Sequence, residues 1–156
     1  MVFSVRGNAV AQLRAEVDQS GSPINFIEFA SLEGLNSRLS AADVHIVSLR
    51  EEWTGTVVPS KFFGALAIGR PVLFVGSANS AIAKWIKQMG VGWVLEQDRI
   101  EILATELTQW AQSPKAKAVL FQHCHTVYQR EFSQRRALDH WDRALRALLS
   151  GRSSRK

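Results

Sequence analysis

The sequence has 156 residues and a net charge of +5, and its 46% apolar and 21% charged residues are typical of one soluble globular domain. No apolar run reaches the roughly 18 residues of a membrane span, and the first residues turn polar too early for a secretory signal. The single cysteine, Cys124, excludes an internal disulfide. From these three observations we expect a cytoplasmic protein. Residues 114–156 hold ten Lys and Arg against three Asp and Glu (+7), whereas residues 1–113 hold nine against eleven (−2), which argues against a nucleic-acid partner and permits contact of the tail with anionic lipid.

The first part of the chain alternates expected strands with expected helices. The Gly7-Asn8 turn follows the first strand, and Ser31 is expected to cap a short helix. The expected strands cover residues 2–5, 24–29 and 43–49, and the expected first helix covers residues 9–18.

The stretch from Val58 to Gly76 contains the clearest local signals. Pro59 and Ser60 are residues that open helices, by fixed φ and by side-chain capping respectively. Gly69 is expected to end this helix, and Pro71 cannot continue it. The apolar run 72–75 then predicts a parallel strand covered on both faces.

The remaining chain continues the alternation and then becomes helical. We expect a helix over residues 81–89, a strand over 90–95, a helix over 99–112, and helices beyond Pro114 with a break near residues 131–133. Together these elements predict an α/β fold: a Rossmann-like parallel sheet flanked by helices, with a helical C-terminal tail. The predicted organisation is a domain over residues 1–113, C-terminal helices of the same domain over 114–150, and a disordered tail over 151–156.

Candidate chemistry lies in the loops that follow the strands, because parallel sheets bind ligands beyond the carboxyl ends of their strands. The loop 50–61 is long for such a connection and carries Glu51 and Glu52. Lys61 in the first helical turn opposes the helix dipole, so it forms an anion site together with free N–H groups, or it is a surface lysine whose stem packs on a phenylalanine.

The loop 76–80 leads from a strand into a helix, and its N–H groups can bind a phosphate. The alternative, which these residues alone favour, is a surface helix capped by Ser77, Asn79 or Ser80. The loop matches neither a Walker A motif nor Gly-x-Gly-x-x-Gly. His123-Cys124-His125 has metal-binding residue types, but neighbours on a helix point about 100° apart, so we expect no metal site.

Residues 59–72, Pro-Ser-Lys-Phe-Phe-Gly-Ala-Leu-Ala-Ile-Gly-Arg-Pro-Val, resemble the donor-site signature of family 4-like GT-B glycosyltransferases (glycosyl transferases group 1). The resemblance extends to about Trp110, with a family-like helical tail behind it. It implies the C-terminal, donor-binding domain of the GT-B fold. The family's two glutamates fall at Thr56 and Gly64 here; Glu51 or Glu52 can replace one, and nothing replaces the ribose contact at Gly64. The donor-binding residues implied are Gly7, Thr56, Ser60, Lys61, Gly64, Ser77, Asn79 and Ser80, and the candidate catalytic residues are Glu51, Glu52 and Lys61.

The resemblance also implies a reaction and its partners. A sugar passes from a nucleoside diphosphate sugar to a hydroxyl acceptor, without a cofactor or an essential metal, in polysaccharide or glycolipid synthesis. The family's first strand and helix of this domain, and its N-terminal acceptor domain, are absent from the sequence, so we expect the chain to be inactive alone. The basic C-terminal helices, with Arg135, Arg136 and Arg143, are expected to permit peripheral membrane contact. The alternative is a non-catalytic α/β nucleotide-binding or interaction module.

Overall fold

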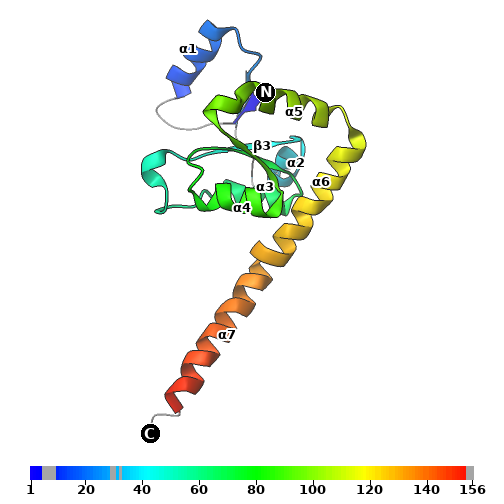
Figure 1. Cartoon of the computed structure of the whole chain (residues 1–156). Helices are drawn as coiled ribbons and strands as arrows, with labels where there is room; N and C mark the ends of the chain where they lie inside the picture. The colour runs from blue at the N-terminus through cyan, green and yellow to red at the C-terminus, as the bar shows by residue number, and fades with distance from the viewer. Residues whose placement is uncertain (5–9, 29–30, 32, 154–156) are drawn as a thin grey trace. The chain divides into compact units, whose positions relative to one another are not determined.

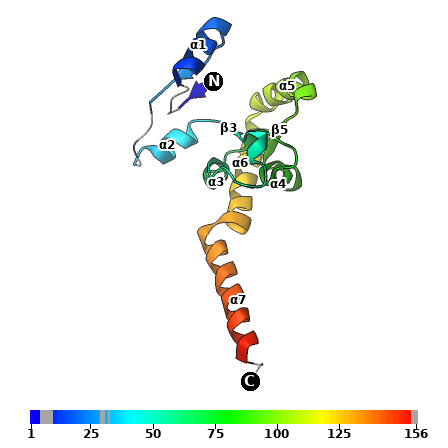
Figure 2. The ribbon, with the colours of Figure 1, turned by 90° about the vertical axis from the view of Figure 1, so that its left-hand side faces the viewer.

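The computed structural model describes residues 1–4, 10–28, 31 and 33–153, and Figures 1 and 2 present it from two directions. By its internal contacts the chain divides into two compact units, Met1–Arg38 and Leu39–Lys156. Helix α2 (Leu35–Ser40) crosses from the first unit into the second.

The first unit contains a small parallel sheet of two strands, β1 (Val2–Phe3) and β2 (Asn25–Phe26), connected through helix α1 (Val10–Ser20). The rings of Phe3 and Phe26 meet edge to face with their centroids 5.8 Å apart. Both strands are shorter than the segments expected from the sequence, and residues 5 and 29 of those segments lie outside the described residues. Among the described residues of this unit, Val17 is the one buried apolar side chain, which leaves little core to support longer pairing.

The second unit is built on three parallel strands in the order β3-β4-β5. These strands are β3 (His45–Ser48), β4 (Val72–Val75) and β5 (Gly92–Leu95). The central strand is the apolar run that the sequence predicted as a strand covered on both faces, and Val72 and Phe74 in it are fully buried. The parallel α/β sheet is therefore confirmed.

Helices flank this sheet as predicted. Helices α3 (Lys61–Ala67) and α4 (Ala81–Met89) form the crossovers between neighbouring strands, and α5 (Ile100–Ala111) follows the last strand. In Figures 1 and 2, α3 and α4 lie below the sheet and α5 lies above it. Because each crossover helix returns the chain to the start of the next strand, the N-termini of α3 and α4 lie at the carboxyl edge of the sheet.

Helix α3 ends as predicted but begins differently. The N–H of Arg70 donates to the carbonyl of Ala65 (2.9 Å) and that of Gly69 to Leu66 (3.0 Å), with φ of +71° at Gly69. These two bonds form a Schellman motif, which requires the left-handed conformation that glycine adopts without strain. The predicted side-chain cap at Ser60 is wrong: its backbone is already helical (φ −62°, ψ −23°), and its hydroxyl makes no capping hydrogen bond.

The hydrophobic core of the second unit lies mainly between the sheet and the layer of α3 and α4. Helix α6 (Pro114–Val127) adds Cys124 and Val127 to it. The buried side chains that form it are Val47, Phe62, Ala65, Leu66, Val72, Phe74, Ile82, Ala83, Ile86, Val91, Cys124 and Val127.

The C-terminal helices break where the sequence predicted. A one-turn π-helix, η3 (Tyr128–Phe132), is followed by Ser133 in extended conformation (ψ 152°), and then α7 (Gln134–Ser153) begins. Residues 151–153 of the tail that was predicted to be disordered belong to this helix, and residues 154–156 lie outside the described part of the chain. Among the helices of the described residues, none combines the length and apolar character that a bilayer crossing needs.

Candidate functional site

The carboxyl edge of the three-stranded sheet brings two of the predicted loops together. The N–H of Leu49, just beyond β3, donates to the carbonyl of Val75 at the end of β4 (2.9 Å). A Cβ added to Gly76 would lie only 2.6 Å from the carbonyl oxygen of Leu49 and 2.8 Å from the ring of Phe74. The loops that follow β3 and β4 therefore leave the sheet in direct contact, and only glycine fits at their junction.

The first of these loops carries the two predicted carboxylates on a short 3₁₀-helix, η1 (Glu51–Trp53). Both Glu51 and Glu52 are exposed, and Glu52 lies 3.7 Å from the guanidinium of Arg50. Such an exposed ion pair contributes little to stability, so the carboxylate of Glu52, like that of Glu51, is available to contact a ligand. Thr56, farther along the loop, is also exposed.

The loop ends at Lys61, the first residue of α3, which is exposed. Gly64 lies three residues later and therefore on the same side of the helix. A Cβ added to Gly64 would meet no atom of the described residues within 4 Å, and its backbone is not in the left-handed region. Packing therefore does not require glycine there, although a helix interior with glycine is less stable than one with alanine by about 1 kcal/mol. The missing side chain leaves open space about one helical turn from Lys61.

The second loop opens helix α4 through a serine cap. The hydroxyl of Ser80, which is buried, accepts the N–H of Ala83 (3.2 Å), and the hydroxyl of Ser77 accepts the N–H of Asn79 (3.3 Å). The structure therefore agrees with the alternative predicted from the sequence, a helix capped by the side chain of Ser80. The N–H groups of Ala81 and Ile82 have no partner among the described residues, so this helix start retains donors.

The structure places most of the predicted residues at one edge of the sheet. Glu51, Glu52, Thr56, Ser60 and Lys61 lie in the connection from β3 into α3, and the serines and Asn79 lie in the connection from β4 into α4. Gly7 lies outside the described residues.

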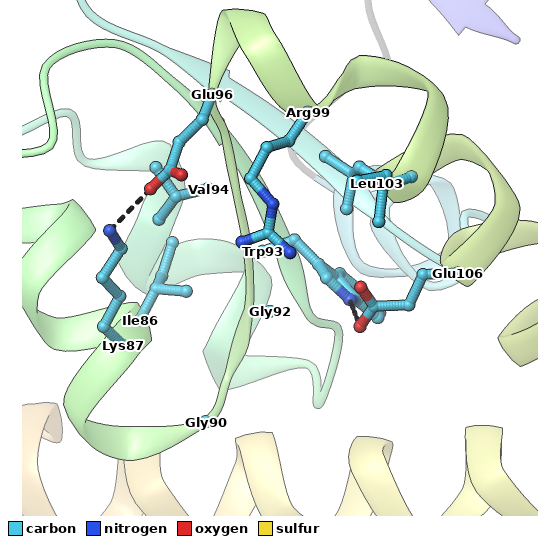
Figure 3. Close-up of a pocket in the computed structure, with 11 residues that line it drawn as sticks. Ile86, Lys87, Gly90, Gly92, Trp93, Val94, Glu96, Arg99, Leu103 and Glu106 are labelled. Atoms are coloured by element: carbon cyan, nitrogen blue, oxygen red, sulfur yellow. Dashed lines mark hydrogen bonds and ion pairs between the residues drawn. The ribbon is translucent and has the colours of Figure 1, made fainter.

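A pocket that the sequence did not predict lies along the outer strand β5, between the end of α4 and the start of α5 (Figure 3). Its volume is about 310 Å³. The Lys87 ammonium bonds to the carboxylate of Glu96 (2.7 Å), and the indole N–H of Trp93 donates to Glu106 (2.9 Å). The hydrogen bond from Lys87, aided by its charge, lowers the pKa of Glu96. The residues that line the pocket are Ile86, Lys87, Gly90, Gly92, Trp93, Val94, Glu96, Arg99, Ile102, Leu103 and Glu106.

This pocket has little attraction for a diphosphate. It contains two cations, Lys87 and Arg99, against two carboxylates, Glu96 and Glu106, so its formal charge is zero. Glu96 and Arg99 nevertheless follow the carboxyl end of a strand. The sequence pattern of a strand followed by a helix over residues 90–112 was therefore a signal from which this loop could have been added to the candidate ligand-binding loops.

The rings of His123 and His125, on either side of Cys124, contact two separate partners. The ring of His123 bonds to the carbonyl of Met89 (2.6 Å), and that of His125 to the carbonyl of Ala67 (2.9 Å), which are the last residues of α4 and α3. Cys124 is buried between them, and burial raises its thiol pKa to about 12. The two histidines thus connect α6 to the C-termini of both crossover helices, which is a structural role.

Comparison with known proteins gives a partial match. No family model matches the chain. Over 58 residues the chain is 38% identical to the "Probable glycosyltransferase WbjE" of Pseudomonas aeruginosa. The matched stretch covers 37% of this chain and 14% of that protein, so the chain corresponds to a minor part of this relative. The similarity supports a glycosyltransferase role in general terms.

Proposed function

We propose that this chain is the donor-binding part of a GT-B glycosyltransferase, family 4-like, that transfers a sugar from a nucleoside diphosphate sugar to a hydroxyl acceptor. The observation that carries the proposal is the junction at Gly76, where the loop leading to Lys61 touches the loop that opens α4. The resemblance of residues 59–72 and the partial similarity to a probable glycosyltransferase support the same assignment.

In this proposal the diphosphate binds at the carboxyl edge of the sheet. Its negative charge meets the ammonium of Lys61 and the free N–H groups at the start of α4. The charge on the leaving diphosphate grows as the bond to the sugar breaks, so these fixed donors stabilise the transition state more than the bound substrate. Metal ions are not required for this role, and the hydroxyl of Ser77 adds a donor.

The sugar and the acceptor need further groups. We assign Glu51 or Glu52 to the sugar hydroxyls, since both carboxylates are solvated and follow β3 at the same edge. The acceptor is bound by a separate domain outside residues 1–156, so transfer requires that domain. Polysaccharide or glycolipid synthesis is the process in which we place the complete enzyme.

The first test is Lys61→Ala. We expect uridine, guanosine or adenosine diphosphate to raise the melting temperature of the chain, and the substitution to weaken binding of that nucleotide roughly tenfold, because an exposed charge-assisted hydrogen bond is lost. Isothermal titration calorimetry on the same samples gives the affinity.

The matched control is Lys115→Ala, which removes an exposed lysine from the first turn of α6. Helix α6 begins near the opposite edge of the sheet, where Lys117 pairs with Asp43 ahead of β3 (3.0 Å). Equal affinities of the two variants would contradict the assignment of Lys61. A wild-type chain that responds to none of the three nucleotides would favour the non-catalytic interaction module.

A second test uses the open space at Gly64. We expect Gly64→Ala to stabilise the chain by about 0.5–1 kcal/mol, since alanine is the better helix former and its methyl group meets nothing. If the ribose approaches α3 there, the same substitution lowers nucleotide affinity several-fold, and Gly64→Leu lowers it further. A more stable variant with unchanged affinity would place the ribose elsewhere.

A further inference from the structure

Helix α7 carries an apolar stripe that nothing in the described part of the second unit covers. Its side chains from Gln134 to Ser150 are all exposed. Among them are five large apolar side chains, with exposed fractions from 53% to 69%: Leu138, Trp141, Leu145, Leu148 and Leu149. Apolar side chains that gather in this way on a surface mark an interaction site.

Over residues 134–150, the stripe and the arginines occupy different sides of the helix. Successive residues of an α-helix are rotated by about 100°, so the five apolar side chains fall within an arc of about 100°. Four of the five arginines of α7 lie outside this arc: Arg135 and Arg146 are nearer to it, and Arg136 and Arg143 lie farther round, whereas the position of Arg152, near the end of the helix, falls inside it. Against these four positive charges, Asp139 and Asp142 supply two negative ones, and Asp142 is paired with Arg146 at 2.8 Å.

We propose that α7 docks on an anionic lipid bilayer, lying in the interface with its apolar stripe in the headgroup and acyl boundary. A helix with a wide apolar face that includes Trp and Leu, an Arg-rich polar face and low overall hydrophobicity is the type that lies in a membrane surface. The charge complements anionic headgroups, because residues 114–156 hold ten Lys and Arg against three Asp and Glu. The inference goes beyond the proposed function and does not depend on it.

A second copy of this chain fits the stripe less well. Leu138, Trp141, Leu145 and Leu148 have heptad spacing, but they extend over fewer than two heptads, whereas a coiled coil needs about three or four. Three of the four flanking positions that would carry complementary charges across a dimer are uncharged (Ala137, Ala144 and Leu149), and the fourth, Asp142, is paired with Arg146 of its own helix. The wide apolar stripe, flanked by Ala137 and Ala144 on one side, is better matched to lipid.

The test is flotation of the 156-residue chain with vesicles of phosphatidylcholine containing one third phosphatidylglycerol. We expect the wild-type chain to float with these vesicles, to bind pure phosphatidylcholine at least tenfold less, and to dissociate as salt is raised. Leu145→Glu is expected to lower the partition coefficient at least tenfold. The matched control, Val119→Glu, adds the same charge at an exposed apolar position of α6 (63% exposed, against 53% at Leu145) and should change binding less than twofold.

A second variant tests the charge. Reversal of Arg135, Arg136 and Arg143 to Glu is expected to lower binding to the anionic vesicles at least tenfold, with the helix content checked by circular dichroism. Wild-type chain that stays with the buffer, or Leu145→Glu chain that floats like wild type, overturns the proposal. Sedimentation that finds a wild-type dimer, dissociated by Leu145→Glu, overturns it in favour of a second copy. Nucleotide affinity, measured in parallel, is expected to be the same in all these variants.

Discussion

Gly92→Ala is expected to destabilise the second unit by about 3 kcal/mol or more, a large part of the stability of a typical domain. Gly92 is the first residue of β5, and its φ of +147° is one that other residues rarely adopt. An added Cβ would overlap the carbonyl oxygen of Val72 and lie 2.7 Å from its nitrogen. These are backbone atoms of the central strand, so no side-chain rotation relieves the overlap.

The relief available is a shift of β5 away from β4. Val72 and Gly92 are paired in the ladder, so such a shift would loosen the pairing of the outer strand and open the pocket beside it. Urea denaturation followed by circular dichroism measures the change. Gly64→Ala is the matched control, because the same added methyl group meets open space in a helix and should raise stability. A loss below about 1 kcal/mol in Gly92→Ala would mean that the two strands accommodate a side chain there.

The sequence predicted the second unit well because its signals are local. Each element of this unit is specified by residues within or next to it: the strand by the apolar run 72–75, the end of the helix before it by Gly69 and Pro71, and the next helix by the apolar periodicity over 81–89. The first unit was harder to predict, since alternation over residues 24–29 indicated a longer strand than the two residues of β2. Alternating apolar and polar residues form a strand only where the apolar face can be buried, and the first unit buries little apolar surface.

The roles of individual polar residues were less predictable. Ser60 and Ser80 both precede helices, yet only Ser80 caps its helix, because its backbone is extended (ψ 154°) whereas that of Ser60 is helical. The sequence offers no way to distinguish the two. His123 and His125 bond to carbonyls 34 and 58 residues away, and Arg70 donates to the carbonyls of Ser40 and Ala42. Such partners are fixed by the tertiary fold alone.

The candidate site shows the same division between local and long-range information. The sequence identified the loops after β3 and β4, since position after a strand is a local property. It did not predict that Gly76 presses against the carbonyl of Leu49, which is the contact that makes these two loops neighbours. The pocket beside β5 was missed for a related reason: Trp93 and Glu106 meet across 13 residues of chain.

Phe62→Ala is expected to cost about 3–5 kcal/mol, the usual range for removal of a fully buried phenylalanine. The side chain of Phe62 is 0% exposed and lies at the centre of an aromatic cluster. Its ring centroid is 5.4 Å from that of Phe63, 5.8 Å from that of Trp85 and 5.8 Å from that of Phe132. Truncation would leave a cavity between α3, α4 and the π-helix η3, because three rigid rings cannot all move into the space.

The loss should also spread to the C-terminal helices, since Phe132 is the contact of η3 with this cluster. We therefore expect faster hydrogen exchange in residues 128–133 of Phe62→Ala, together with a lower midpoint of guanidinium denaturation. Trp141→Ala is the matched control: it removes an aromatic side chain that is 65% exposed and should change stability by less than about 0.5 kcal/mol. Phe62→Leu, which retains most of the buried volume, should cost about 1.5 kcal/mol or less. Equal midpoints for Phe62→Ala and Trp141→Ala would show that the aromatic cluster does not hold the C-terminal helices to the sheet unit.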